Sequence, residues 1–216
     1  MDFGLARRNM VESQIRPNKV TDPRLIDAIA AVQRERFAPA ALRSVAYVDE
    51  DIPLGNRRYL MEPMIFARLL QAAGVQPSDL VLDVGCGSGY STAVLARLAE
   101  MVVALESDAE LARLAGATLT ELSVDNAVVL QGPLADGMAK QAPYDLIFIG
   151  GAVLRVPDAL LRQMAEGGRL VTVIGSNGVG QATLLRKTDG TISRQQLFDA
   201  AVPALPGFAA ETRFVF

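Results

Sequence analysis

Val81-Leu82-Asp83-Val84-Gly85-Cys86-Gly87-Ser88-Gly89-Tyr90 is the stretch that decides the fold of this chain. An apolar run ends in an acidic residue, a loop with glycine at every second position follows, and a helical pattern continues from Ser91 to Leu98. Strand, glycine-rich turn and helix in this order form the opening unit of a nucleotide-binding α/β sheet, where glycine lets the backbone approach a ligand closely. We therefore predict a ligand site over this loop.

The glycine spacing indicates which class of ligand the loop would take. Gly85, Gly87 and Gly89 give Gly-x-Gly-x-Gly, whereas the dinucleotide fingerprint would place a glycine at Tyr90. The spacing therefore disfavours a nicotinamide oxidoreductase. A loop that need not cradle a pyrophosphate suits S-adenosylmethionine, which has a zwitterionic methionine tail and a cationic sulfonium. An ordinary βα turn without a ligand is the alternative.

A second predicted strand, at 101–106, ends in Glu106 and is followed by Ser107. An acidic residue at this strand tip can accept hydrogen bonds from both hydroxyls of a ribose. The alternative is a solvated carboxylate, or a charge at the N-terminus of the next helix. Together with Asp83 and the three glycines, Glu106 favours adenosine binding. The cofactor contacts predicted from this unit are Asp83, Gly85, Cys86, Gly87, Ser88, Gly89, Glu106 and Ser107.

Composition limits the function classes. The chain has 216 residues, half of them apolar, which suits one structural unit with a substantial core. We expect no membrane span, because no stretch of about 18 apolar residues occurs, and no secretory signal at the N-terminus. A net charge of −3 without a long basic run argues against nucleic acid as the main partner. Cys86 is the single cysteine, so an internal disulfide is excluded. We therefore take a cytoplasmic location as the default. We interpret Cys86 as a small packing residue of the glycine loop and not as a nucleophile.

Histidine is absent from the sequence. Its absence removes Ser-His-Asp and Cys-His catalysis and most zinc chemistry, and we predict no metal site. Any reaction must need little proton transfer, or must use a carboxylate, Lys or Tyr. Methyl transfer to a carboxylate fits this constraint, because that nucleophile is already ionised at neutral pH and the protein mainly supplies alignment and desolvation.

Alternating patterns predict an α/β fold with a doubly wound, mostly parallel Rossmann-like sheet and an N-terminal helical extension. Residues 9–45 read as helices, with a helix start at Thr21-Asp22-Pro23; residues 46–63 read as an extended loop, and a helix over 64–74 stops at Gly74. Strands are predicted at 80–84, 101–106, 127–131, 145–150, 169–174, 183–187 and 211–216, and helices at 90–99, 108–122 and 157–166.

Over most of its length the chain resembles the protein-L-isoaspartate O-methyltransferase family. The specific part is N-terminal, because other methyltransferases that use S-adenosylmethionine lack it. The matching runs are Val20-Thr21-Asp22-Pro23-Arg24-Leu25, Arg34-Glu35-Arg36-Phe37-Ala38-Pro39, Ile52-Pro53-Leu54-Gly55 with Pro63, Ala142-Pro143-Tyr144-Asp145-Leu146-Ile147, Gly167-Gly168-Arg169-Leu170-Val171 and Val202-Pro203-Ala204-Leu205-Pro206-Gly207. The resemblance implies S-adenosylmethionine as cofactor and methylation of the free carboxylate of isoaspartyl residues in damaged protein. It also implies a division into 1–63, the helical extension with the substrate loop, and 64–216, the methyltransferase domain.

The chain departs from the family pattern where chemistry is expected. The family has a Gly-Gln-Thr-Ile-Ser run ending two residues before the proline that matches Pro63, and its last serine is the active-site residue. Met61 stands at that serine, so no catalytic residue can be carried over. The substrate loop is Arg57, Arg58, Tyr59, Leu60 and Met61.

A second departure follows the third strand of the predicted methyltransferase domain. The family has Gly-Asp-Gly there, with the aspartate at the adenine amino group. Here the run is Gly132-Pro133-Leu134, which offers no acceptor side chain and, at Pro133, no N–H. We expect these three residues to complete the cofactor contacts without that hydrogen bond.

Two rival functions follow from these departures. The first is a methyltransferase of the same fold that acts on another carboxylate or a small molecule, with Arg57 or Arg58 binding the anion. The second is a protein that binds the cofactor or a partner but has lost turnover. The sequence does not indicate the oligomeric state.

Overall fold

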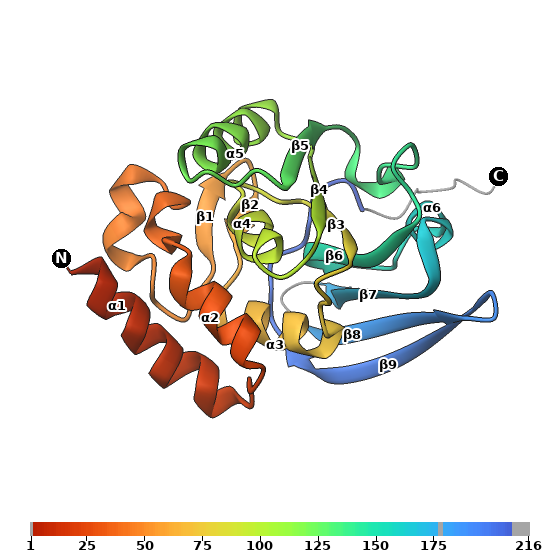
Figure 1. Ribbon diagram of the computed structural model, residues 1–216, viewed down its shortest axis with the longest axis horizontal. Helices are drawn as coiled ribbons and strands as arrows, with labels where there is room; N and C mark the ends of the chain where they lie inside the picture. Colours follow the sequence, from red (N-terminus) through yellow and green to blue (C-terminus); the bar gives the residue numbers. More distant parts are fainter. Residues whose placement is uncertain (1, 177–178, 209–216) are drawn as a thin grey trace.

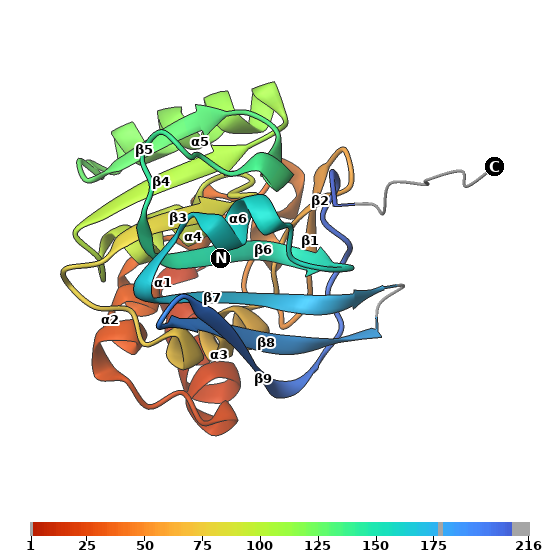
Figure 2. The ribbon, with the colours of Figure 1, turned by 90° about the vertical axis from the view of Figure 1, so that its right-hand side faces the viewer.

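The computed structural model describes residues 2–176 and 179–208, and these form one seven-stranded sheet with helices on both faces (Figure 1). The strand order is β5-β4-β3-β6-β7-β8-β9, which Figure 2 shows from the side. Five strands are parallel: β3 (Leu80–Val84), β4 (Met101–Glu106), β5 (Ala127–Gln131), β6 (Tyr144–Val153) and β7 (Met164–Ser176). The predicted doubly wound, mostly parallel sheet is confirmed. In the described ranges no helix has the length and apolar character needed to cross a membrane.

The far edge of the sheet differs from the prediction. The strand expected at 183–187 is the longer β8 (Val179–Thr188), and it pairs antiparallel with both β7 and β9 (Thr191–Ala200). The sequence did not indicate β9 because most of its side chains are exposed or half-buried and it lacks an apolar pattern. The helix expected at 157–166 is only α6 (Asp158–Arg162), since β7 already begins at Met164. The strand expected at 211–216 lies outside the described residues.

Alternate residues of the central strands point to opposite faces of the sheet. Val81 of β3 belongs to the core cluster under the N-terminal helices, whereas Leu82 belongs to the cluster under α6. This alternation is the ordinary consequence of the two-residue period of a strand. Both faces are therefore apolar, as the near-continuous apolar runs of these strands require.

The N-terminal extension forms a layer of helices on one side of the molecule (Figure 1). Asp22 caps α2 and Pro23 opens it, as predicted, and Gly74 ends α3 in a left-handed conformation with φ of 59°. The helical segments of this layer are α1 (Phe3–Met10), the π-helical turn Val11–Ile15, the 3₁₀ turns Arg16–Asn18, Arg34–Arg36 and Ala40–Val45, and α2 (Pro23–Ala31). The helix α3 (Pro63–Ala73) packs against the π-helical turn and α2, and it begins at the boundary expected between the two parts of the chain.

The segment expected as an extended loop, 46–63, contains a β-hairpin instead. Strands β1 (Ile52–Gly55) and β2 (Arg58–Leu60) pair antiparallel and form a separate two-stranded sheet. Asn56 and Arg57 join them with φ of 48° and 58°, which are the left-handed values of a tight hairpin turn. The proline and glycine content suggested a loop, but the turn residues allow the strands on either side to pair.

Asp83 joins β3 to the helix that follows the glycine loop, α4 (Tyr90–Ala96). One carboxylate oxygen of Asp83, Oδ2, accepts hydrogen bonds from the hydroxyls of Ser91 and Thr92, each at 2.7 Å. Burial raises the pKa of Asp83 to about 6, against the opposing effect of these two hydrogen bonds. The sequence placed Asp83 among the cofactor contacts; in the structure its first role is to hold the strand and the helix together.

Arg169 holds the start of β3 to β7 and α3. Its guanidinium forms a buried ion pair with Asp79, with 2.6 Å between Nη2 and Oδ2 and 3.1 Å between Nη1 and Oδ1. It also donates to the carbonyl oxygens of Ala73, Gly74 and Asp145. A buried charge is stable only when its hydrogen-bonding capacity is met in this way.

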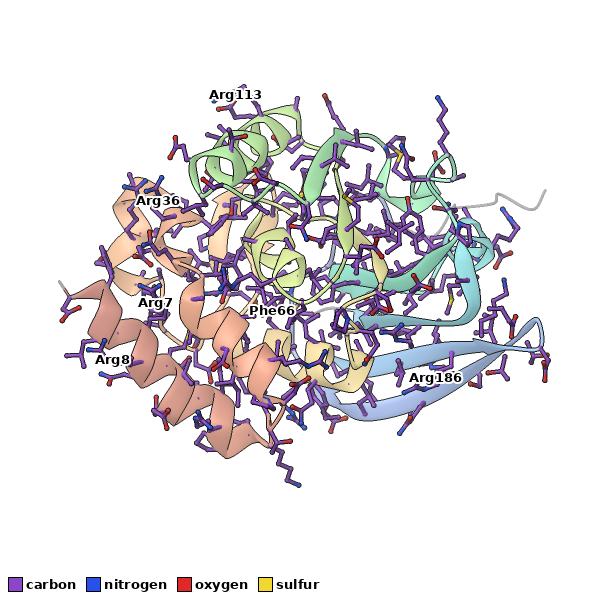
Figure 3. The ribbon with its side chains drawn as sticks, viewed as in Figure 1. Arg7, Arg8, Arg36, Phe66, Arg113 and Arg186 are labelled. Carbon is purple, nitrogen blue, oxygen red and sulfur yellow. The ribbon has the colours of Figure 1, made fainter. Side chains whose placement is uncertain are left out.

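Replacing Arg169 by methionine is expected to lower the free energy of unfolding by about 3–5 kcal/mol, because Asp79 is left as an unpaired buried charge. Urea unfolding followed by circular dichroism measures this. The matched control is Arg113→Met, because Arg113 also pairs with a carboxylate at 2.6 Å, but on the surface of α5 (Ala109–Glu121), where it points to solvent (Figure 3). Loss of an exposed pair should leave the midpoint unchanged within error, and equal losses in both variants would contradict the prediction.

The raised pKa of Asp83 predicts how stability depends on pH. A carboxyl whose pKa is higher in the folded state binds its proton more tightly there than in the unfolded state. Its contribution to the free energy of unfolding therefore falls as pH rises from about 4 to about 6. Relative to the unmodified protein, Asp83→Asn should therefore gain stability across this window, by up to about 3 kcal/mol from a shift of about two pKa units. Urea unfolding of both proteins between pH 4.5 and 7 tests this. The control is Asp27→Asn, because Asp27 is exposed on α2. If the free energies of unfolding of Asp83→Asn and the unmodified protein differed by the same amount at every pH, the prediction would be refuted.

Candidate cofactor and substrate site

The glycine loop lies where the order of the strands reverses. The chain runs outward from β3 through β4 to β5 and then returns to β6 on the other side of β3. In open α/β sheets, ligands bind at such a switch point, beyond the carboxyl ends of the strands. The glycine loop and Glu106 thus lie at the edge of the sheet where ligands bind in folds of this class.

Three glycines give the loop its shape. Gly85, Gly87 and Gly89 have φ of 77°, 56° and 97°, a region that side chains with a Cβ rarely adopt. The hydroxyl of Ser88 donates to the carbonyl oxygen of Phe37 at 2.6 Å and so attaches the loop to the N-terminal layer. Cys86 is buried against Ala104 and Ala115, and burial raises its pKa well above the usual range. Its thiol is therefore protonated, which agrees with a packing role.

Glu106 is buried at the tip of β4 and its carboxylate is surrounded by donors. The backbone N–H of Gly87 lies 2.8 Å from Oε2, and the N–H groups of Ser107 and Asp108 lie 2.8 and 3.1 Å from Oε1. Burial by itself would raise the pKa of Glu106, but the hydrogen bonds and charge of Arg58 outweigh it and the pKa is lowered. Glu106 is therefore ionised near neutral pH.

Arg58 supplies the positive charge beside Glu106. It lies on β2, is only 3% exposed, and reaches the carboxylate with Nη2 at 2.6 Å from Oε2 and Nε at 3.2 Å from Oε1. The expectation that Arg58 could bind a substrate anion is therefore not supported by this geometry, because its charge is already paired. Arg57, next to it on the turn, is exposed.

The space above the loop is almost filled by side chains. A Cβ added to Gly85 would lie 3.0 Å from both Nη2 of Arg58 and Cδ1 of Leu205, and one added to Gly87 would lie 2.9 Å from Cδ1 of Leu54. The two cavities that Met61 borders measure about 10 and 20 Å³, whereas a third cavity, lined by Ser88 of the loop, Leu54 and residues of α5, measures about 420 Å³. Pockets for cofactor-sized ligands usually measure about 300–1,000 Å³.

The frame of this site fits S-adenosylmethionine, but the side chains above it would have to move. The glycine backbone leaves room for close approach, and Glu106 lies at a strand tip, the position from which an acidic residue binds a ribose in nucleotide-binding folds. Oδ1 of Asp83 is buried without a hydrogen-bond partner among the described residues, which suits a ligand with donor groups. Against this, Arg58, Leu205 and Leu54 lie directly on the loop.

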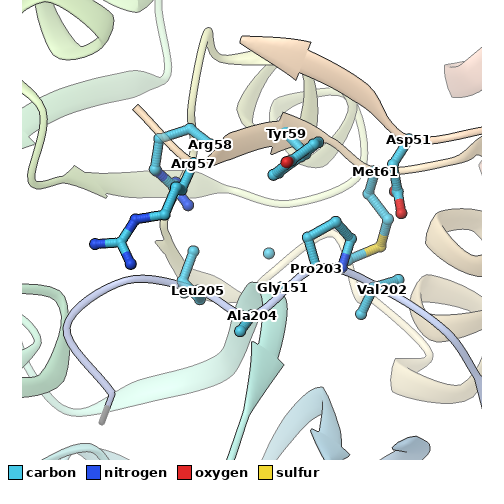
Figure 4. A pocket seen from close by; sticks show the side chains of 11 residues that line it. Asp51, Arg57, Arg58, Tyr59, Met61, Gly151, Val202, Pro203, Ala204 and Leu205 are labelled. Carbon is cyan, nitrogen blue, oxygen red and sulfur yellow. The ribbon is translucent and has the colours of Figure 1, made fainter. Parts of the chain in front are cut away.

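The substrate loop places its residues on two faces of the hairpin. Leu60 and Met61 are buried, and Met61 borders both small cavities beside the glycine loop. Tyr59 is 36% exposed and points away from Leu60. Figure 4 shows Tyr59 and Met61 on the hairpin side, facing Val202 and Pro203 of the C-terminal segment. Met61 thus lies beside the glycine loop, since both line one small cavity.

The backbone of Met61 is held by a buried arginine that the sequence did not single out. Arg34 is fully buried and donates to the carbonyl oxygens of Met61 and Ala46, each at 2.7 Å. Its guanidinium carbon lies 4.8 Å from the centroid of the Tyr90 ring, within the range of a cation–π contact. Arg34 therefore fixes the substrate loop against α4.

Two carboxyl groups near Met61 have raised pKa values. Burial raises the pKa of Asp51 to about 6, against a hydrogen bond from the N–H of Glu62 and the charge of Arg34. Burial, with the neighbouring carboxylates of Asp49 and Asp51, raises the pKa of Glu62 to about 7. Asp51 also borders one of the small cavities, so a titratable group lies beside Met61.

A groove of about 490 Å³ lies on the outer side of the hairpin. Arg57 and Tyr59 form one wall, and β6 and the C-terminal segment form the other. The lining residues on that second wall include Val153, Leu154, Pro203, Leu205 and Phe208. The groove is large enough for a peptide segment, unlike the cavities of about 10 and 20 Å³ that Met61 borders.

The three residues of the run after β5, Gly132-Pro133-Leu134, lie in different surroundings. The N–H of Gly132 donates to the carbonyl oxygen of Glu106 at 3.0 Å, so Gly132 lies beside the acidic strand tip. Leu134 is buried in the core under α6, and Pro133 is exposed. No cluster of metal-ligating side chains occurs in the part of the chain that the structure describes.

Comparison with known proteins identifies the family. The sequence model of the family described as protein-L-isoaspartate(D-aspartate) O-methyltransferase matches residues 6–204. A protein-L-isoaspartate O-methyltransferase of Koribacter versatilis is 39% identical over 205 residues, covering 95% of this chain and 92% of its own. One of Methylorubrum populi is 40% identical over 210 residues, covering 95% of this chain and 97% of its own.

Solved structures share the fold. A protein-L-isoaspartate O-methyltransferase superposes with a TM-score of 0.81 at 23% identity, over 94% of this chain and 67% of its own. A second structure, from Plasmodium falciparum, is provisionally described as a protein-L-isoaspartate O-methyltransferase in complex with S-adenosyl-L-homocysteine. It superposes with a TM-score of 0.80 at 19% identity, over 93% of this chain and 98% of its own. By the extent of the sequence match, the chain belongs to the protein-L-isoaspartate O-methyltransferase family.

Proposed function

We propose that this protein transfers a methyl group from S-adenosylmethionine to the free carboxylate of an isoaspartyl residue in a damaged protein or peptide. The observation that carries the proposal is the family match over residues 6–204, which includes the N-terminal layer that other methyltransferases lack. The glycine loop and Glu106 at the switch point of the sheet support the same cofactor.

The cofactor, when bound, supplies a methyl group that is activated by a positively charged sulfur. We assign the glycine loop to its methionine part and Glu106, with Ser107 beside it, to its ribose. Gly132 is the residue of the run after β5 that lies close enough to that tip to contribute a backbone contact, and we assign Leu134 to the core. Asp83 orients the loop through α4, and we assign its second oxygen, which has no partner among the described residues, to a donor group of the cofactor.

The acceptor requires no general base. A carboxylate is ionised at neutral pH, so its oxygen can attack the methyl carbon while the bond to sulfur breaks and the electron pair remains on sulfur. No proton changes place, which is consistent with a chain that has no histidine. The protein has to align the two groups and exclude water.

The substrate would lie in the outer groove, between the hairpin and the C-terminal segment. Arg57 is the exposed cation on this wall, so it is better placed than Arg58 to attract an anionic group. This observation also favours the alternative of another carboxylate-bearing acceptor. Met61 provides no hydroxyl where the family has its serine, so we expect poor activity on isoaspartyl peptides. A cytoplasmic location and the absence of a nucleic-acid partner stay predictions.

Replacing Met61 by serine is expected to raise methyl transfer to an isoaspartyl peptide by about ten- to a hundredfold. The unpaired polar group of the substrate costs roughly 1–3 kcal/mol in the unmodified protein, and each 1.36 kcal/mol is a factor of ten in rate. Transfer of label from methyl-labelled cofactor to the peptide measures the rate, with the normal aspartyl peptide as the blank.

The control for this prediction is Met64→Ser, which removes a neighbouring methionine on α3 that does not border the cavities. It should leave the rate unchanged. Vigorous transfer by the unmodified protein would show that backbone contacts suffice in the loop. No transfer by either protein to isoaspartyl peptide, but transfer to another carboxylate, would favour the alternative acceptor.

A further inference from the structure

The acceptor capacity of Glu106 is already used up in this structure. A carboxylate offers about four lone-pair positions. Three backbone N–H groups, from Gly87, Ser107 and Asp108, occupy some of these, and Arg58 adds two donors. The hydroxyl of Ser107 lies 3.3 Å from Oε1 as well. Any ligand whose hydroxyls are to bind Glu106 must therefore displace a donor.

Among these donors, Arg58 is the one that can leave without unfolding the sheet. The N–H groups of Ser107 and Asp108 follow β4 directly, and that of Gly87 lies inside the glycine loop. Arg58 instead reaches Glu106 from a residue 48 positions away, at the end of a long and rotatable side chain. Removal of its guanidinium would leave the three backbone donors in place.

The hairpin that carries Arg58 is not part of the seven-stranded sheet. Strands β1 and β2 pair only with each other among the described residues. At the hairpin tip, the side-chain amide of Asn56 donates to Asp108 at 2.6 Å, so Asn56 and Arg58 attach the hairpin to the same corner. Leu54, from the first strand of the hairpin, covers Gly87. The hairpin thus covers the loop through side chains that can turn away.

We propose that Arg58 is an internal competitor of the cofactor: its guanidinium occupies the carboxylate of Glu106 and closes the space above Gly85. The proposal rests on the assignment of this site to S-adenosylmethionine and deepens it. The unmodified protein then binds the cofactor only to the extent that Arg58 withdraws, because the two compete for one carboxylate. Arg58 would set the affinity for the cofactor, whereas Met61 would affect the rate of methyl transfer to the acceptor.

The test is titration calorimetry with S-adenosyl-L-homocysteine, the demethylated cofactor, which binds without turnover. Arg58→Gln introduces the residue that the family pattern has at this position and removes the charge. We expect it to bind roughly ten- to a hundredfold more tightly than the unmodified protein, the range for hydrogen bonds to a charged group. The matched control is Arg113→Gln, whose arginine pairs with Glu110 at the same 2.6 Å but on the surface, and its affinity should equal that of the unmodified protein.

A second readout separates competition from a purely structural role. Without ligand, Arg58→Gln should melt at a lower temperature than the unmodified protein, because Glu106 has lost its cation. Added S-adenosyl-L-homocysteine should then raise the melting temperature more in Arg58→Gln than in the unmodified protein. Arg58→Lys keeps a positive charge beside Glu106 but cannot form the two-pronged contact. It should show a smaller gain in affinity and provides the test if Arg58→Gln does not fold.

The outcomes distinguish this proposal from the function on which it rests. Equal and tight binding by the unmodified protein and Arg58→Gln would overturn the competition and leave the methyltransferase assignment standing. Weaker binding by Arg58→Gln would show that Arg58 supports the cofactor site. No binding by any variant would overturn both the competition and the cofactor assignment. Tighter binding with no methyl transfer to any acceptor would support the competition while refuting the proposed reaction.

Discussion

The buried carboxylate of Glu106 is the constraint on which the site depends. A charge at the interior tip of a strand has to be compensated, because burial alone would favour the protonated form. Here the compensation comes from backbone N–H groups of the glycine loop and of the start of α5, and from Arg58. The position of the hairpin follows from this requirement, since Arg58 reaches the carboxylate only when β2 lies over the loop.

Buried arginines connect segments that are far apart in the sequence. Arg34 joins the N-terminal layer to the substrate loop, Arg58 joins the hairpin to β4, and Arg169 joins β7 to the start of β3. A buried ion pair adds less net stability than its geometry suggests, because desolvation offsets the attraction. For Arg169 the effect is instead on specificity, because an arrangement that left Asp79 buried without its partner would be strongly disfavoured.

Of the two departures from the family pattern, the one at the substrate loop lies in a single short segment. Met61 stands where the family has a serine, and Arg58, three residues before it, pairs with Glu106 beside the glycine loop. Arg58 lies on β2 and Met61 directly follows this strand. The segment formed by β2 and Met61 lies between the glycine loop and the outer groove. The sheet, the glycine loop and the acidic strand tip remain as the family requires.

The sequence determined the elements whose signal is local. Apolar runs located β3 to β7, the glycine pattern located the turn between β3 and α4, and Asp22-Pro23 and Gly74 marked helix ends, because each signal depends on neighbouring residues alone. The hairpin was missed, although Arg58 and Leu60 share its buried face with the two-residue period of a strand. Only the tertiary structure decided that Arg58 and not Arg57 is buried, and that Leu205 lies on Gly85. The physical reason is that a buried charge takes its position from its partner, and the partner of Arg58 is 48 residues away in the sequence.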